Sequence, residues 1–515
     1  MKNLRLCWAA FGLCVSLGVS AQRGSCGTGV SWALADGTLT ISGEGNMTDF
    51  TDPRYGSSNL PSWDIYKDNI VKVVIEGGVK HVGSYAFYDY SNLQAVTFAE
   101  GVKSIGSSAF YGCEGIKELL FPSSMKIISG QHNTNEDAEP QVSTFGMGGT
   151  GTAYMSSEAF RGCAGLTSVT IPRGVIGVGS GTFKNCRNLK SVYWDVADYP
   201  SYGFSTANEN GFRDYGTQGS SPFSGCRLKE VVFGSEVDSI PGGLLYGQSE
   251  LSAIKFSGKT EYVGKDAFKE TVWFDNLPNG LVYIDKAAYA FKGLMSTPTA
   301  ISITEGTKSI TEGLFANQTY LTKVTVPSTL TYMGYEVFEG CRSLGEVEWN
   351  AEDCKFGQTY GAPFSATALY TITFGEKVRK IPDGLCSGCR YITEVKMPAS
   401  VVEVGESAFS DCSGLEAVGF SENMTSIEAR AFLDCAKLSE LILPNSLREI
   451  GENAFSGCTG LETLSIPESV DSIGRSAFYN TGLEILVFNA RNCMLVYESY
   501  STAFPSSVRE LEFGD

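Results

Sequence analysis

Histidine is nearly absent from the sequence, which contains only His81 and His132 among its 515 residues. Histidine supplies the proton transfers of many hydrolytic sites, so this scarcity disfavours a histidine-dependent hydrolase. His81 lies between Val79 and Val82, where we expect a variable, solvent-exposed position of the chain.

Positive charge is also scarce, because 39 Lys and Arg stand against 57 Asp and Glu and give a formal net charge of −18. Such a chain repels phosphate backbones and anionic lipid, and no basic cluster offers a local exception. Nucleic acid is therefore not an expected partner. Hydrophobic residues make up 43% of the chain, which is enough to build a continuous core.

Long apolar runs are missing except near the N-terminus, where one extends from Leu6 to Val19. It follows two basic residues and ends in a small-residue sequence, which predicts a secretory signal peptide over residues 1–21. Cleavage is expected before Gln22. We expect no membrane insertion of the mature chain, and export to the medium, the cell surface or the periplasm.

A 23-residue repeat organises most of the chain. Phe409, Phe432, Phe455 and Phe478 are each 23 residues apart, and a cysteine column and a leucine column keep the same spacing. The phenylalanine slot recurs 17 times, with Leu or Cys at two of the positions: 87, 110, 160, 183, 223, 245, 268, 291, 315, 338, 364, 386, 409, 432, 455, 478 and 504. A unit this short cannot bury its own apolar side, so the units must stack and share one core.

Each repeat contains a segment that alternates with period two. In one of them, Leu464 and Ile466 are predicted to point inward, and Thr463 and Ser465 outward. Stacked segments of this kind form a parallel sheet on one face, and the following Pro467 suits the end of a strand. The chain then returns across the opposite side, where four residues are predicted to be inward: Val470, Ile473, Ala477 and Phe478.

The pattern I-P-x-S-V-x-x-I-G-x-x-A-F-x-G-C-x-x-L-x-x-L resembles the BspA-like leucine-rich repeats of bacterial surface proteins, over roughly residues 70–515. The resemblance implies a mainly β, right-handed leucine-rich-repeat solenoid with a parallel sheet on one face. Members with known roles are mostly cell-surface adhesins or proteins that interact with a host. The resemblance implies the fold more directly than a ligand, because one scaffold carries many binding sites.

Residues 22–69 are expected to form an N-terminal β cap, and they resemble the leader that commonly precedes these repeats. Within segment 30–41, apolar residues alternate on either side of Asp36-Gly37, which is typical of a two-residue hairpin turn. A hairpin here would cover the open end of the solenoid.

Two insertions, near residues 129–155 and 195–221, break the spacing of the repeat. The first contains GMGGTG, which matches a dinucleotide-binding fingerprint but lacks the preceding strand and the following helix that a pyrophosphate site needs. We therefore interpret it as a loop. The same insertion contains His132 and several acidic residues without the spacing of a calcium loop, so a solvated loop is favoured and metal binding is left open.

Of the 15 cysteines, 13 follow the predicted signal peptide, an odd number that argues against complete disulfide pairing. Most occupy one slot just before the strand of each repeat: Cys113, Cys163, Cys186, Cys226, Cys341, Cys389, Cys412, Cys435 and Cys458. Cys386 and Cys389 match a C-x-x-C spacing, but they occupy the phenylalanine slot and the cysteine slot of one repeat. We therefore expect reduced core residues, no metal site and no cofactor.

Aromatic density around the second insertion stands out from the repeat background. The candidate ligand-binding residues are Tyr193, Tyr199, Tyr202, Phe204, Phe212 and Tyr215. Tyr193 is expected to point outward from a strand, and the others follow on a loop that either packs on the solenoid or forms a ligand platform. In the same outward column Val232, Ile442 and Val487 are also apolar, which fits β-propensity as well as a binding patch.

A solenoid with a long open surface favours binding over catalysis. We expect an exported or cell-surface adhesion protein that recognises an extracellular protein or glycan, host-derived ligands included, through its strand face and inserted loops. A structural surface component without a specific ligand is the alternative. A carbohydrate-active enzyme is disfavoured, because no enclosed pocket is expected and no carboxylate pair stands out among the 57 acidic residues.

Overall fold

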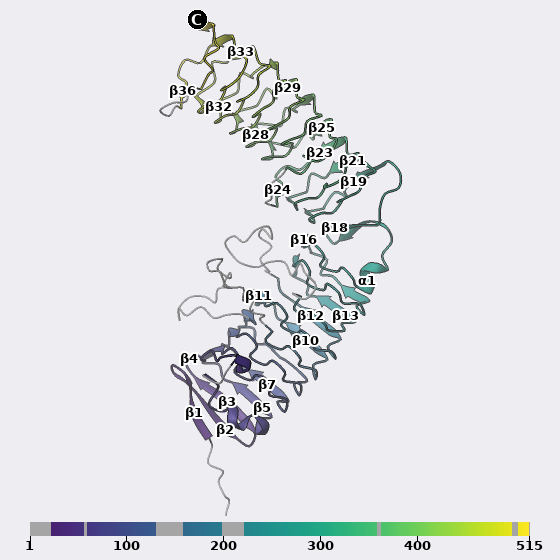
Figure 1. The fold of residues 1–515 in the computed structure, drawn as a ribbon, viewed down its shortest axis with the longest axis vertical. Coiled ribbons are helices and arrows are strands. Elements are labelled where there is room, and N and C mark those ends of the chain that lie inside the picture. The colour runs from purple at the N-terminus through teal and green to yellow at the C-terminus, as the bar shows by residue number, and fades with distance from the viewer. Residues whose placement is uncertain are drawn as a thin grey trace, which may run out of the picture.

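The chain coils into an elongated stack of turns, which Figure 1 shows from the cap at the N-terminal end to the last turns. The computed structural model describes residues 22–55, 59–129, 158–197, 221–357, 362–496 and 503–513. The predicted mainly β solenoid is confirmed, with about 17 stacked turns. The signal peptide, the GMGGTG segment and His132 lie outside the described residues, so what we expect of them remains a prediction.

Most turns contribute a long strand to one side of the stack and a short strand to the other. The long strand β33 (Thr463–Ile466) alternates between exposed and buried residues and buries Leu464 and Ile466, as predicted. The short strand β34 (Ser472–Ile473) lies on the return path. Because strands of one kind pair in parallel with their equivalents in neighbouring turns, two ladders run along opposite sides of the stack (Figure 1).

The outward residues of the long strands form one surface, which we name the long-strand face. The long strands are β5 (Lys72–Ile75), β7 (Ala95–Phe98), β10 (Ser168–Ile171), β12 (Ser191–Trp194), β13 (Glu230–Phe233), β15 (Ala253–Lys255), β19 (Thr299–Ser302), β21 (Leu321–Val326), β23 (Glu346–Trp349), β25 (Thr371–Phe374), β27 (Glu394–Lys396), β29 (Ala417–Gly419), β31 (Glu440–Leu441), β33, β35 (Ile485–Phe488) and β37 (Glu510–Phe513). The short strands are β4 (Gly45–Asn46), β6 (Val79–Val82), β8 (Ser104–Ile105), β9 (Ile127–Ile128), β11 (Gly177–Val178), β14 (Ser239–Ile240), β16 (Tyr262–Val263), β20 (Ser309–Ile310), β22 (Tyr332–Met333), β24 (Lys355–Phe356), β26 (Lys380–Ile381), β28 (Glu403–Val404), β30 (Ser426–Ile427), β32 (Glu449–Ile450), β34 and β36 (Met494–Leu495).

Between the two ladders, the phenylalanine of one turn stacks on that of the next. The ring centroids of Phe432 and Phe455 lie 5.3 Å apart, with the rings nearly parallel. The backbone is left-handed two residues before and two residues after Phe455, at Asn453 and Gly457. Glycine, Asn and Asp tolerate positive φ best, which explains why one of them commonly follows the phenylalanine by two positions.

An antiparallel sheet closes the N-terminal end of the stack. The cap consists of β1 (Gln22–Gly27), β2 (Val30–Ala35), β3 (Thr38–Gly43) and two 3-10 helices, η1 (Pro53–Tyr55) and η2 (Asp64–Asn69). The predicted turn at Asp36-Gly37 is confirmed, with φ values of 48° and 72° that suit a two-residue hairpin. Strand β3 then pairs in parallel with β5, so the cap continues directly into the long-strand ladder.

The repeat is interrupted between β15 and β19, where a short helix and a hairpin replace one turn. Helix α1 (Val272–Asp275) is followed by the antiparallel strands β17 (Gly280–Ile284) and β18 (Ala287–Lys292). Spacing assigns Phe291 to the phenylalanine slot of the repeat, but the structure places it in a strand of this hairpin instead. Phe291 belongs to β18, and its ring is tilted by 48° from that of Phe315.

Alternation within this hairpin directs one of its faces to each half of the molecule. Ile284 and Tyr289 belong to the core of the N-terminal half, whereas Tyr283 and Phe291 pack against the core of the C-terminal half. The buried apolar residues of the described chain consequently form two clusters. The hairpin therefore separates two cores and is covered by apolar contacts on both sides.

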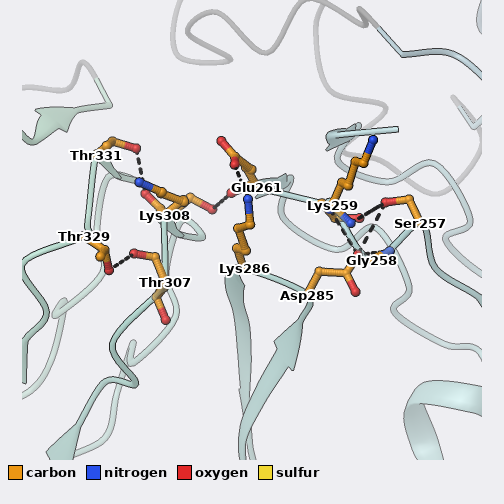
Figure 2. A network of polar contacts seen from close by, with 12 residues as sticks. Ser257, Gly258, Lys259, Glu261, Asp285, Lys286, Thr307, Lys308, Thr329 and Thr331 are labelled. Carbon is orange, nitrogen blue, oxygen red and sulfur yellow. Dashed lines mark hydrogen bonds and ion pairs between the residues drawn. The ribbon is translucent and has the colours of Figure 1, made fainter. Parts of the chain in front are cut away.

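Polar contacts connect the two halves across this junction (Figure 2). The carboxylate of Asp285, in the hairpin turn, accepts backbone N–H bonds from Gly258 at 2.9 Å and from Thr260 at 3.1 Å. Lys286 Nζ lies 2.6 Å from Glu261 Oε1. Strands β16 and β18 do not belong to one sheet, so hydrogen bonds to these side chains take the place of a regular ladder here.

Candidate functional site

The long-strand face presents the outward side chains of successive strands as one open surface. Pairing in register brings Thr170, Tyr193 and Val232 side by side on β10, β12 and β13. Tyr193 points outward as expected and is 41% exposed. The other candidate residues, Tyr199, Tyr202, Phe204, Phe212 and Tyr215, lie outside the described residues, so their role in binding remains a prediction.

The strand that carries Tyr193 is held firmly from the inside. Its neighbours Val192 and Trp194 are buried, and the Trp194 ring contacts Phe223 edge-on at a centroid distance of 6.4 Å. Strand β12 is also hydrogen bonded on both sides, to β10 and β13. A side chain on such a strand is preorganised, so a ligand that contacts Tyr193 loses little free energy to ordering of the backbone.

His81 is buried, which contradicts the prediction of an exposed position. Its side chain is only 1% exposed, because it lies between Asn46 of β4 and Ser104 of β8 in an inward column of the short strands, where Ser104 is buried as well. Nδ1 lies 2.8 Å from Ser104 Oγ, and Nε2 lies 3.3 Å from Asp49 Oδ1. These residue types match those of a catalytic triad, but the serine is buried and the aspartate is at the surface, which reverses the access that a nucleophile needs. We interpret the hydrogen-bonded row of Ser104, His81 and Asp49 as a structural polar contact.

All 13 cysteines of the described chain are free thiols, and 12 of them are buried. The predicted core position of Cys386 and Cys389 is confirmed. In the cysteine column, the thiol donates a hydrogen bond to the carbonyl of the phenylalanine slot one turn earlier, as Cys435 does to Phe409 at 3.1 Å. Burial raises the pKa of Cys341 to about 11, so the neutral thiol is the stable form in the core.

One carboxylate pair stands out on the short-strand side, although the sequence could not single it out. Lys380 Nζ lies 2.6 Å from Glu403 Oε1 and 3.1 Å from Glu428 Oε1. The pKa of Glu403 is lowered by its hydrogen bond with Glu428 and by its contact with Lys380. The pKa of Glu428 is raised by burial and by the same hydrogen bond with Glu403. Direct hydrogen bonding leaves the carboxyl groups closer than the roughly 5 Å that a retaining glycosidase needs, so this pair does not match such a site.

Metal sites and membrane spans are both missing from the ranges that the structure describes. No group of three or more His, Cys, Asp and Glu side chains there is arranged to hold a metal ion. None of the helices in these ranges combines the length and the apolar character of a membrane span.

Comparisons with known proteins agree with this architecture. The family model described as "BspA type Leucine rich repeat region" matches residues 58–136, 149–211, 210–291, 283–416 and 379–504. A comparison with curated proteins gives no match.

Several solved structures are similar to the chain. A leucine-rich repeat protein from Bacteroides ovatus shares 20% identity over 91% of this chain and 98% of its own, with a TM-score of 0.33. A leucine rich cell surface protein from Faecalibacterium prausnitzii shares 20% identity over 92% and 95%, with a TM-score of 0.27. An internalin from Listeria monocytogenes shares 11% identity over 87% and 88%, with a TM-score of 0.21.

Proposed function

The chain belongs to the BspA-type leucine-rich-repeat family, and we propose that it is an exported or cell-surface binding protein. It recognises an extracellular protein or glycan through the long-strand face and the adjoining inserted loops. Catalysis is not part of this proposal. The recognition is adhesive, and host-derived molecules are included among the ligands.

The observation that carries the proposal is the exposed Tyr193 on strand β12, which is hydrogen bonded to a neighbouring strand on each side. Tyr193 also comes immediately before the aromatic insertion near 195–221. Tyrosine offers a large apolar ring and a hydroxyl with few rotatable bonds, which makes it a common anchor of binding surfaces. The parallel ladder beside it extends the surface over neighbouring turns, so a macromolecular ligand can contact several repeats at once.

The test is binding of the mature chain to an array of extracellular matrix proteins and glycans. Tyr193→Ala is expected to weaken the binding of a captured ligand by about 1 to 3 kcal/mol, as the loss of an interface anchor does. The double variant Tyr202→Ala, Tyr215→Ala in the insertion should have an effect of the same size. Tyr479→Ala is the matched control, because Tyr479 is 60% exposed and does not lie on a long strand.

Thermal stability should barely change in these variants, because neighbouring repeats supply the core. A large drop in the melting temperature with unchanged binding would make the aromatic residues structural. Absence of any saturable ligand would favour a structural surface component instead. Turnover of a captured glycan would replace the proposal with an enzymatic function.

A further inference from the structure

The long-strand ladder is interrupted between β31 and β33, as it also is between β7 and β10, between β15 and β19, and between β25 and β27. Strand β31 pairs with β29 and strand β33 with β35, but β31 and β33 are not paired with each other. The rest of these two turns remains closed. Short strands β30, β32 and β34 pair without a break, and the stacking distance from Phe432 to Phe455 equals that from Phe455 to Phe478, 5.3 Å in both cases. The two turns therefore separate only on the long-strand face.

The opening forms a groove with a volume of about 450 Å³. It is lined by Leu441, Ile442, Leu443, Asn445, Ser465, Pro467, Glu468, Asn489 and Arg491. Leu441, Leu443 and Pro467 are buried and give it an apolar floor. Polar side chains border it, and Arg491 Nε lies 3.3 Å from Glu468 Oε1 on the exposed rim.

Ile442 in this groove belongs to the outward column of the repeat and is 84% exposed, more than the other aliphatic residues of that column on long strands. Val232 and Val487 occupy the same column in paired strands and are half-buried by their neighbours. High β-propensity accounts for apolar residues in a paired strand, but Ile442 lies just beyond the end of β31. The groove consequently places an exposed aliphatic side chain beside a buried apolar floor.

The chemistry of the groove identifies the class of occupant. The facing edges of β31 and β33 carry backbone N–H and C=O groups of the kind that bond to the next turn elsewhere in the ladder, and an extended polypeptide supplies matching groups. The lining contains no aromatic ring on which a sugar could stack. We propose that the groove binds an extended segment of a partner protein, with an apolar side chain of that segment beside Ile442. This inference rests on the proposed binding function and adds a peptide subsite to it.

The proposal can be tested by selecting a phage-displayed library of random 12-residue peptides on the full mature chain. Selected peptides are expected to lose about tenfold or more in affinity for Ile442→Ser and for Arg491→Ala, because both side chains line the groove. Val74→Ser is the matched control, since it makes the same kind of change in the same outward column of a strand paired on both sides, and Val74 is neither beside Tyr193 nor in the groove lining. Methylation of alternate backbone nitrogens of the peptide should weaken binding by a similar factor, because it removes the donors that a strand edge requires.

Failure to enrich any peptide, or peptides that bind Ile442→Ser and wild type equally, would overturn the proposal. So would tolerance of backbone methylation at every position. Self-association of the chain that Ile442→Ser abolishes would identify a second copy as the occupant instead. The array assay separates the proposed binding function from the peptide groove. If ligand binding is lost in Tyr193→Ala but retained in Ile442→Ser, the proposed function is supported and the groove does not contribute to it.

Discussion

The cysteine slot of the repeat requires a small side chain that is apolar and still able to donate a hydrogen bond. Cys412, Cys435 and Cys458 are each buried, and each thiol bonds to a backbone carbonyl one turn earlier. A row of thiols at the same point of successive turns provides packing contacts along the stack, and none of these cysteines is in a disulfide. The thiols therefore support the fold in reduced form.

Burial should make these thiols slow to react. A thiol reagent at pH 8 is expected to label Cys493 first, because it is the one described cysteine that is not fully buried. The column should react only when denaturant is added, since burial raises the pKa of its members, Cys435 among them, and disfavours the reactive thiolate. Mass spectrometry of labelled peptides measures the order. Rapid native labelling of Cys435, or a disulfide that includes it, would contradict the core role.

The contact between Asp49 and His81 predicts a dependence of stability on pH. Partial burial raises the pKa of Asp49, but the hydrogen bond and the Coulombic interaction with His81, together with the Ser84 N–H, outweigh it and hold the pKa well below its usual range. A carboxylate with a lowered folded-state pKa stabilises the fold above its unfolded pKa of about 3.9. That contribution disappears as the pH falls through the folded value.

Asp49→Asn should therefore destabilise the N-terminal half at pH 7, by less than about 1 kcal/mol because the Asp49 side chain is half exposed and screened by solvent. The difference between variant and wild type should shrink steadily below pH 4. Thermal melts at pH 7, 4 and 2.5 measure it, with the exposed Asp68→Asn as control. A difference that grows towards acid pH would show that the carboxylate does not stabilise the fold in its charged form.

Single residues were predictable from the sequence where the repeat sets their environment. The inward positions of Leu464, Ile466 and Cys389 follow from spacing alone, and the structure confirms them. His81 was not predictable in this way, because its inward column holds polar and apolar residues alike, Ser104 and Ile127 among them, so hydropathy does not mark it as buried. Periodicity accounts for the contact of His81 with Ser104, which is one repeat of 23 residues away, but not for the contact with Asp49, which comes from the cap.

At the scale of secondary structure elements, glycines allow adjacent turns to approach closely. A Cβ atom built on Gly451 would lie 2.5 Å from the backbone nitrogen of Ala429, and the backbone would have to shift. Gly451→Ala is expected to destabilise the surrounding turns by about 1 to 3 kcal/mol, the usual cost of overpacking. Hydrogen exchange of the C-terminal half measures the loss.

Gly419→Ala is the control for this variant, because the nearest atom to its added Cβ is a flexible lysine side-chain carbon at 3.5 Å. It should leave exchange nearly unchanged. Equal effects of the two variants would mean that close approach between turns does not limit the packing of this region.

Regular strands could be predicted, whereas interruptions of the ladder could not. The hairpin of β17 and β18 contains an aromatic residue at the expected spacing, so spacing alone places Phe291 in the repeat although the chain follows another path there. The opening between β31 and β33 is equally hidden, because both segments carry the same alternation as their paired neighbours. Both features depend on how one turn is placed on another, and a single turn does not encode that placement.

At the scale of the whole molecule, two separate cores predict two unfolding transitions. Calorimetry of the full chain should resolve one transition for each half, because repeats contact mainly their neighbours and the hairpin separates the two clusters. Asp285→Ala removes the acceptor that bonds to Gly258 and Thr260 across the junction. The lower transition should then fall by about 2 to 4 °C for each kcal/mol of coupling lost, with the upper one unchanged.

Asp285→Asn serves as the control, since an amide oxygen can still accept one of these hydrogen bonds. It should shift the lower transition less than alanine does. A single cooperative transition in the wild type would show that the two cores unfold as one unit despite the hairpin between them.

The two-faced hairpin also bears on how such a chain can grow in evolution. One of its faces ends the N-terminal array, and the other begins the C-terminal array. A gene that joins two arrays through such a hairpin does not need to match the register of their long-strand ladders, because that ladder stops at β15 and starts again at β19. Whole arrays could therefore be exchanged or added at this boundary by recombination, and each ancestor would keep the surface for which it was selected.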